Sequence, residues 1–294
     1  MSSLTNAVSA LWLAAVLALI SVFGGAAVSP VRAAAHTGPQ ILDQQEVPVL
    51  QESLGEDYVP TVLITGSNRG IGLEFARQYL ERGWSVIATA RRSDAAEALN
   101  ALAEKYPDRL AIEQLDVTDH ARVDALAAKY ADRPIDVLLN NAGIGGGSQN
   151  QVFAQKMDYA VFEEVLRVNA VAPLKITEAF WKQVAASRDK KIITVSSSQG
   201  SIERATRPSL YFYRSSKAAL NMVMRNLAEL LKRREIIVGL VNPGPTDTDF
   251  MAGLPKSMLR PTPDAVADML RNIDGLTLET TGSFLQYDGS IIPW

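Results

Sequence analysis

The 294-residue chain contains no cysteine and only two histidines, His36 and His120. Disulfides, cysteine-based zinc sites, iron–sulfur ligation and thiol nucleophiles are therefore excluded, and a histidine-based catalytic set is poorly supplied. The chain also lacks an excess of positive charge. Its formal net charge is −3, which gives no electrostatic footprint for nucleic acid or for an anionic membrane surface. Any chemistry must rely on Ser, Tyr, Lys, Asp or Asn side chains, or on a bound cofactor.

The start of the chain carries no charge either, since Arg32 is its first charged side chain and residues 11–28 are almost wholly apolar. Three interpretations of residues 1–35 stay open: a cleaved signal peptide, a membrane anchor through residues 7–31, or an organellar transit peptide. Residues 36–57 contain two prolines and many polar side chains. We interpret them as a linker that precedes the folded domain.

From Tyr58 onward, short apolar runs alternate with helix-length amphipathic runs. This alternation is typical of βαβ units and predicts one α/β domain over residues 58–294, with a single doubly wound, parallel, seven-stranded sheet of Rossmann type and helices on both faces. The expected strands are Thr61–Thr65, Ser85–Ala90, Leu110–Leu115, Ile135–Asn140, Lys191–Ser196, Ile236–Val241 and Ser283–Tyr287. The expected helices are Ile71–Arg82, Asp94–Tyr106, His120–Tyr130, Val161–Ala186, Tyr213–Arg233 and Pro263–Asn272.

Three glycines lie between Thr65 and Gly72, where the first expected strand leads into a helix. Glycine permits a tight turn and lets the main chain approach a pyrophosphate, while the helix N-terminus offers unpaired N–H groups and a partial positive charge. In this position the pattern predicts a dinucleotide site rather than an ordinary turn. The residues expected to bind the cofactor here are Gly66, Ser67, Arg69, Gly70, Ile71 and Gly72.

The end of the second expected strand indicates which dinucleotide is bound. NAD enzymes tend to place an acid there to hold the ribose 2′-hydroxyl, but this chain has Ala90 followed by Arg91 and Arg92. An acid would repel a 2′-phosphate, whereas a guanidinium pairs with it. The sequence therefore favours NADP(H) over NAD(H), with Arg91 as the contact and Arg69 near the same phosphate.

A tyrosine and a lysine lie four residues apart near the start of the helix expected over residues 213–233. Positions i and i+4 share a helix face, so Tyr213 and Lys217 are expected to point into one cleft. A nearby ammonium should lower the tyrosine pKa and make the phenol a general acid or base. Tyr211 has no lysine at that spacing. Three serines, residues 196–198, end the preceding strand, where a hydroxyl can bind a substrate carbonyl oxygen.

Together these motifs resemble the short-chain dehydrogenase/reductase family, whose fingerprint T-G-x-x-x-G-x-G matches Thr65–Gly72. The resemblance covers residues 60–294. The stretch Tyr213–Leu227 and the segment Gly282–Trp294 are similar to the carbonyl reductases related to C-factor and sniffer. The motifs occur in the family's order and on the expected elements, so they are jointly more specific than any one of them.

The resemblance also assigns roles to single residues. The family pattern S-S-x-x-G, ending here at Gly200, selects Ser197 as the catalytic serine, with Ser198 as the alternative. Asn169 matches an active-site asparagine that holds a proton-relaying water. Because asparagine is a poor helix former, its place within an expected helix indicates either a tolerated polar residue or a local backbone irregularity. The further cofactor contacts that the resemblance implies are Asp116, Val117, Asn140, Ala142, Gly143, Pro243, Gly244, Thr246 and Thr248.

The implied activity is hydride transfer between NADPH and a carbonyl/alcohol pair. Ser197 would polarise the carbonyl oxygen and Tyr213 would protonate it. Lys217 would hold the nicotinamide ribose. Tyr213 is expected to contact the cofactor as well. The alternative is a nucleotide-binding regulatory protein that keeps the fold without significant turnover. An apolar segment after Thr248 indicates a hydrophobic small-molecule substrate, and homo-oligomers are common in the family, whereas a metal site and nucleic-acid binding are not expected.

Location depends on residues 1–35. A cleaved signal peptide would make the protein secreted or periplasmic, where NADPH is scarce. An uncleaved anchor, or a transit peptide that directs the chain into an organelle, would place the domain where NADPH is present. Because Arg32 directly follows the apolar run and positive charge favours the cytoplasmic flank, we expect the domain to face an NADPH-containing compartment.

Overall fold

The computed structural model describes residues 54–55 and 57–294. The apolar segment over residues 1–35 and nearly all of the expected linker lie outside the described residues, so both interpretations stay predictions. Within the described part of the chain, no helix is long and apolar enough to cross a membrane.

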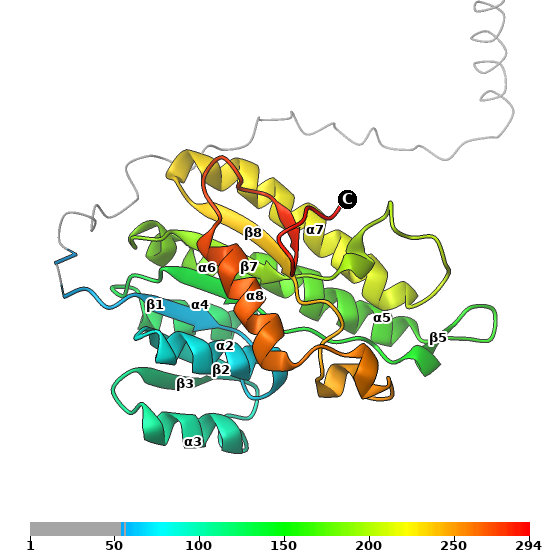
Figure 1. Cartoon of the computed structure of the whole chain (residues 1–294), viewed down its shortest axis with the longest axis horizontal. Coiled ribbons are helices and arrows are strands. Elements are labelled where there is room, and N and C mark those ends of the chain that lie inside the picture. The colour runs from blue at the N-terminus through cyan, green and yellow to red at the C-terminus, as the bar shows by residue number, and fades with distance from the viewer. Residues whose placement is uncertain (1–53, 56) are drawn as a thin grey trace, which may run out of the picture. The chain divides into compact units, whose positions relative to one another are not determined.

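Seven parallel strands form one sheet in the order β3-β2-β1-β4-β7-β8-β9 (Figure 1). The predicted doubly wound α/β fold is confirmed. The strand order reverses between β1 and β4, and in such sheets ligands bind in the crevice outside the carboxyl ends of the strands at that point. The strands are β1 (Thr61–Ile64), β2 (Ser85–Ala90), β3 (Leu110–Gln114), β4 (Val137–Asn140), β7 (Lys191–Val195), β8 (Ile237–Asn242) and β9 (Phe284–Gln286).

Helices cover both faces of the sheet (Figure 1). On one face α2 packs against α3 and α8, and on the other α6 contacts both α4 and α7. β1 lies between β2 and β4 and all its residues are buried, as is usual for parallel strands covered on both faces. The helices are α2 (Gly70–Glu81), α3 (Glu97–Lys105), α4 (His120–Lys129), α5 (Tyr159–Leu166), α6 (Ala172–Ala185), α7 (Tyr211–Leu231) and α8 (Thr262–Asp274).

Short polar signals define several helix ends. Asp119 begins α4 by accepting a hydrogen bond from the Arg122 N–H (3.0 Å), and Asp158 begins α5 by accepting one from the Val161 N–H (3.2 Å). These are ordinary N-caps, in which a carboxylate satisfies a main-chain donor of the first turn. Gly83 follows the end of α2 with a φ of +89°, a conformation that favours glycine there.

Two features depart from the expected elements. A small hairpin, β5 (Gln151–Val152) and β6 (Lys156–Met157), follows β4. The helix expected over residues 161–186 is also divided, because a π-helical segment, Arg167–Val171, separates α5 from α6. There the N–H of Ala172 bonds to the carbonyl of Arg167, five residues back. Of the two explanations offered for Asn169 within an expected helix, the local backbone irregularity is therefore the one that the structure shows.

The chain enters the sheet at the edge opposite the carboxyl ends of the strands (Figure 1). The Tyr58 hydroxyl donates to Asp136, which directly precedes β4 (2.6 Å). Arg188, just before β7, donates to the carbonyls of Leu54 and Gly55 (2.7 and 2.6 Å), and its guanidinium lies 4.7 Å from the centre of the Tyr58 ring. Burial, together with the Asp136 hydrogen bond, raises the pKa of Tyr58. These contacts fasten the segment before β1 to the back of the sheet.

Candidate active site

The glycine loop between β1 and α2 requires glycine at three positions, because of backbone conformation or lack of space for a side chain. Gly66 and Gly70 have φ values of +69° and +54°, which other residues rarely adopt. A Cβ on Gly72 would lie 2.2 Å from the carbonyl oxygen of Gly66. Arg69, the N-cap of α2, makes no side-chain cap hydrogen bond, and the first turn holds no acid, while Ile71 packs against the core. The first N–H groups of α2 therefore suit an anionic ligand.

Asn141, directly after β4, holds the glycine loop in shape. Its Nδ2 donates to the carbonyl oxygens of Thr65 and Gly66 (2.9 and 3.0 Å). In return, the Thr65 hydroxyl oxygen accepts from the N–H groups of Asn141 and Ala142 (3.0 and 3.1 Å). The sequence analysis gave Asn141 no role. The signal that could have found it was its place between Asn140 and Ala142, two expected cofactor contacts.

Three residues expected at the cofactor are buried. Nδ2 of Asn140 lies 3.4 Å from the Thr177 hydroxyl in α6. The Ser67 hydroxyl donates to the carbonyl of Ile64 (2.9 Å), and Val117 is buried after β3. The polar side chains of Asn140 and Ser67 therefore support the fold, and their contacts with a cofactor would be made through the main chain.

Basic side chains lie after the last residue of β2 and before the first residue of α2. Arg91 is exposed directly after β2. Partial burial opposes ionisation of Asp116, but hydrogen bonds from the N–H and hydroxyl of Thr118 (2.9 and 2.7 Å), together with the charge of Arg91, lower the Asp116 pKa. Arg69 instead forms an exposed ion pair with Asp249 (2.9 Å). The charge of Arg91 thus acts on Asp116, whereas Arg69 contacts the segment after β8.

Tyr213 and Lys217 lie one turn apart on α7, as expected. The Lys217 Nζ donates to the carbonyl of Val195 at the end of β7 (2.9 Å) and lies 5.7 Å from the centre of the Tyr213 ring. The Ser197 side chain lowers the pKa of the Tyr213 hydroxyl, so the two side chains lie within reach of each other. The structure therefore brings together three of the four expected catalytic side chains. The ring of Tyr211 instead contacts an aromatic side chain of the β5–β6 hairpin.

The three consecutive serines have different surroundings. The buried Ser196 hydroxyl donates to Oδ1 of Asn221 (2.6 Å). Ser197 is the N-cap of a short 3-10 helix, Ser198–Gly200, and it is the serine whose side chain lowers the pKa of Tyr213. This geometry favours Ser197 over Ser198. Asn221, which is 3% exposed, also donates to the carbonyl of Gly200 (3.3 Å), so it holds both ends of the serine turn against α7.

The pKa values of the tyrosine and lysine follow from burial. Burial raises the pKa of Tyr213 to about 12, and the nearby Ser197 side chain opposes that rise only in part. Burial also lowers the pKa of Lys217 to about 8. The expected lowering of the Tyr213 pKa by Lys217 is therefore wrong for this structure. The lysine donates to Val195, and desolvation of the phenol dominates.

Asn169 lies in the π-helical segment and is fully buried. Its Nδ2 donates to the carbonyl of Ile144 (2.8 Å) and to the Ser216 hydroxyl (2.9 Å), and its Oδ1 accepts from the Ile144 N–H (2.9 Å). A Cβ on Gly143 would lie 3.3 Å from Oδ1 of Asn169 and 3.7 Å from Nζ of Lys217. Asn169 thus ties the loop after β4 to α7. Both amide hydrogens are used, so any water held by Asn169 requires another of its polar atoms.

The loop after β8 approaches the glycine loop. Gly244 has a φ of +72°, and a Cβ there would lie 2.8 Å from the Tyr287 ring. The buried Thr246 hydroxyl donates to the carbonyl of Gly244 (3.2 Å), within the loop itself. Thr248 lies next to the glycine loop. A Cβ built on Gly70 would lie 3.3 Å from Cγ2 of Thr248. Thr248 therefore meets the glycine loop, as a residue of a shared cofactor cleft should.

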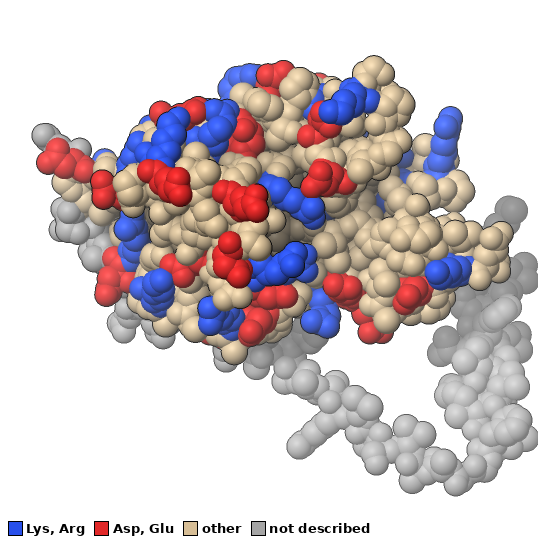
Figure 2. Space-filling view, turned by 90° about the horizontal axis from the view of Figure 1, so that it is seen from below, with Lys and Arg blue, Asp and Glu red and all other residues tan. Residues whose placement is uncertain are grey.

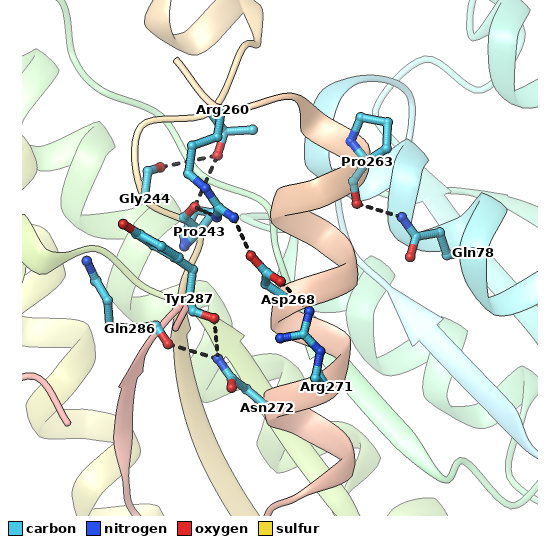
Figure 3. A network of polar contacts seen from close by, with 11 residues as sticks. Gln78, Pro243, Gly244, Arg260, Pro263, Asp268, Arg271, Asn272, Gln286 and Tyr287 are labelled. Carbon is cyan, nitrogen blue, oxygen red and sulfur yellow. Dashed lines mark hydrogen bonds and ion pairs between the residues drawn. The ribbon is translucent and has the colours of Figure 1, made fainter. Parts of the chain in front are cut away.

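Arg260 fastens the loop after β8 (Figure 3). Its guanidinium donates to the carbonyl of Pro243 (3.0 Å), pairs with Asp268 of α8, and lies 3.9 Å from the centre of the Tyr287 ring. Its main-chain N–H donates to the carbonyl of Pro245 (2.7 Å). An arginine that is both paired and stacked in this way is held in one orientation. The loop is therefore anchored to α8 and to the segment after β9.

Charged side chains of both signs are interspersed on the face shown in Figure 2, while its right-hand end is mainly uncharged. That end corresponds to the side of Figure 1 where the β5–β6 hairpin lies.

The described residues also bear on metal binding. Among them, no group of three or more His, Asp or Glu side chains can hold a metal ion. At the carboxyl ends of the strands, the glycine loop thus lies beside the side chains of Ser197, Tyr213 and Lys217.

Comparisons with known proteins agree with this arrangement. A family model described as short chain dehydrogenase matches residues 60–258. The chain is 37% identical to the C-signal protein of Myxococcus xanthus over 170 residues, which are 58% of this chain and 99% of that protein. It is also similar to the NADPH-bound carbonyl reductase from chicken fatty liver (30% identity, TM-score 0.73, 80% of this chain and 99% of that one). The carbonyl reductase Sniffer of D. melanogaster matches with 28% identity and a TM-score of 0.73, over 81% of this chain and 100% of that one. The predicted resemblance is confirmed, and the chain belongs to the short chain dehydrogenase family.

Proposed function

We propose that the protein is an NADP-dependent carbonyl reductase that interconverts a small-molecule carbonyl compound and its alcohol. The observation that carries the proposal is the convergence of Ser197, Tyr213 and Lys217 beside the glycine cradle. The names of similar proteins support it, since two of the structures described above are carbonyl reductases.

The cradle fits a dinucleotide with a 2′-phosphate. No side chain can be added at Gly72 without a collision, and the N-terminus of α2 suits the pyrophosphate. β2 ends at Ala90 with no acid, and Arg91 follows in an exposed position. The Arg91 guanidinium would therefore hold the 2′-phosphate, and Asp116 would bind the adenine amino group. An NAD enzyme would be expected to carry an acid at the end of β2.

The side chains then divide the work of reduction. When bound, NADPH supplies the hydride for the carbonyl carbon. Tyr213 supplies the proton to the carbonyl oxygen, because its hydroxyl is protonated at neutral pH. Ser197 donates a hydrogen bond to the same oxygen. Lys217, an ammonium below about pH 8, would hold the ribose of the nicotinamide.

Asn169 acts mainly by position. It joins Ile144, in the loop after β4, to Ser216, next to the catalytic lysine. We propose that it keeps these segments in register and that the proton-relaying water binds beside it, at main-chain atoms of the π-helical segment. Replacing its side chain should therefore disturb Lys217 as well as proton resupply.

Turnover of carbonyl compounds with NADPH tests the proposal. The purified protein should oxidise NADPH with members of a panel of aldehydes and ketones, and should use NADH less well. Tyr213→Phe keeps the ring but removes the proton, so turnover should fall by at least ~10²-fold, with little change in NADPH affinity. Tyr211→Phe, two residues away on α7, is the matched control and should stay active.

Two results would contradict the proposal. Near-normal activity of Tyr213→Phe would remove Tyr213 from the mechanism. Tight NADPH binding without turnover on any carbonyl compound would favour the alternative, a nucleotide-binding regulatory protein.

We also propose that the domain faces a compartment that contains NADPH, because the Arg91 position selects that cofactor. Protease protection of the isolated membranes or organelles, with detection of the domain and of the mature N-terminus, tests this. A mature protein that starts near residue 35 in the culture medium or periplasm would contradict it and would favour a cleaved signal peptide.

A further inference from the structure

The segment from Thr248 to Leu259 forms a loop whose base is closed. At its two ends, the N–H of Arg260 donates to the carbonyl of Pro245 (2.7 Å), and the N–H of Asp247 donates to the carbonyl of Arg260 (2.9 Å). The Arg260 side chain locks this base against α8 and against Tyr287 (Figure 3). The loop, which we name the lid, therefore leaves and rejoins the domain at one fixed place.

The lid is also held at its first turn. Asp249 pairs with Arg69 of the glycine loop (2.9 Å). The next residue, Phe250, places its ring against that of Tyr213, with centroids 5.3 Å apart and planes inclined by 52°. On its other side, Phe250 meets Gly145 so closely that a Cβ on Gly145 would lie 3.3 Å from Cζ of Phe250. An apolar ring is thus held directly beside the proposed proton donor.

This placement limits what can approach Tyr213. A substrate carbonyl oxygen must reach the hydroxyls of Tyr213 and Ser197, so its substituent must pass or contact Phe250, which is 50% exposed. An aryl substituent gains a ring–ring contact there. A charged or strongly hydrated substituent would lose water beside a ring that offers no polar partner. On its far side the ring lies close against Gly145, so it has little room to move away from Tyr213.

We infer that Phe250 is a specificity-determining residue, and that the preferred substrates are uncharged carbonyl compounds with a flat apolar substituent next to the carbonyl group. This inference rests on the proposed carbonyl reductase activity. It goes beyond that activity by naming the side chain that selects the substrate and the chemical class that it selects. Small aliphatic aldehydes would react at the same centre without the benefit of the ring contact.

The first test compares kcat/KM for benzaldehyde, propanal and 4-carboxybenzaldehyde in the wild type and in Phe250→Ala. Loss of a ring contact in an apolar site should lower the benzaldehyde-to-propanal ratio about tenfold. The wild type should use benzaldehyde much better than its carboxylate derivative. The matched control is Phe153→Ala, because Phe153 pairs in a similar way with Tyr211 (6.3 Å) rather than with Tyr213; its ratio should match that of the wild type.

A second test uses the contact with Gly145. Gly145→Ala should push the Phe250 ring and change the ratio in the wild-type background, but should have little further effect once Phe250 is alanine. Such non-additivity identifies two residues that act through one contact. Additive effects of the two substitutions would overturn this part of the argument.

A measurement without turnover separates substrate contact from chemistry. In the Tyr213→Phe background, saturation-transfer NMR should show that benzaldehyde binds and that benzyl alcohol displaces it. Adding Phe250→Ala should weaken benzaldehyde binding several-fold. If the wild type reduces no carbonyl compound, the proposed function fails. If it is active but the ratio is unchanged in Phe250→Ala, or falls equally in Phe153→Ala, the activity stands and the role of Phe250 is refuted.

Discussion

Replacing Lys217 with methionine should change how the stability of the protein depends on pH. Lys217 is only 4% exposed, and burial lowers its pKa from 10.5 to about 8. Between these two values the unfolded chain binds more protons at this site than the folded chain does. The free energy of unfolding therefore rises with pH in this window, and the stability so gained is lost again as pH falls through about 8.

The size of the effect follows from the shift. One pKa unit corresponds to about 1.36 kcal/mol, so the lowered pKa of Lys217 reduces the free energy of unfolding by on the order of 3 kcal/mol at pH 7 and by roughly 1 kcal/mol at pH 10. The neutral amine can still donate to the Val195 carbonyl, which is 2.9 Å from Nζ. Methionine has a similar length and no charge. The wild type should therefore gain about 2 kcal/mol relative to Lys217→Met between pH 7 and pH 10.

Urea unfolding followed by far-UV circular dichroism, at one-unit steps from pH 7 to pH 10, measures this difference. Met224→Leu is the control, because Met224 is a buried residue of the same helix and neither side chain ionises. Its difference from the wild type should not depend on pH. If the Lys217→Met difference is equally flat, the lysine is not held in an environment that disfavours its charge, and the reasoning fails.

Three further predictions concern the cofactor cradle and the serine turn. Gly72→Ala should abolish NADPH binding in a fluorescence titration, because its Cβ would lie 2.2 Å from the Gly66 carbonyl oxygen; unchanged affinity would contradict the cradle. Ala90→Asp combined with Arg91→Ser should raise the ratio of NADH to NADPH kcat/KM, and an unchanged ratio would remove Arg91 from cofactor selection. Asn221→Ala should lower kcat much more than it weakens NADPH binding, with partial recovery in the similarly polar Asn221→Ser; equal loss of both would indicate general unfolding.

The sheet was predictable because its strands are buried on both faces and therefore appear as apolar runs bounded by turns. The β5–β6 hairpin had no such signal, since each strand spans two residues. It is held by a distant contact, in which Oε1 of Gln151 accepts from the N–H of Phe212 (2.9 Å). The π-helical segment also depends on distant partners, because the Asn169 side chain bonds to Ile144 and Ser216.

The candidate site was predictable where helix periodicity applied. The spacing of Tyr213 and Lys217 placed both on one face of α7, and the same spacing from Lys217 leads to Asn221, which was overlooked. The position of Phe250 has no local signal, because it depends on the closure of the lid by Arg260 and on the Arg69–Asp249 pair. The direction of the tyrosine pKa shift also depends on depth of burial, which periodicity does not reveal.

The way in which the chain joins its sheet has a practical consequence. The residues that lead into β1 are bound by Asp136 and Arg188 at the amino ends of the strands. The glycine cradle and Tyr213 lie at the carboxyl ends. A resin, a fluorescent protein or a lipid group joined at Leu54, in a chain that begins there, would therefore be carried at the amino ends of the strands. An immobilised reductase made in this way should keep free diffusion of both cofactor and substrate, while attachment within the lid would obstruct them.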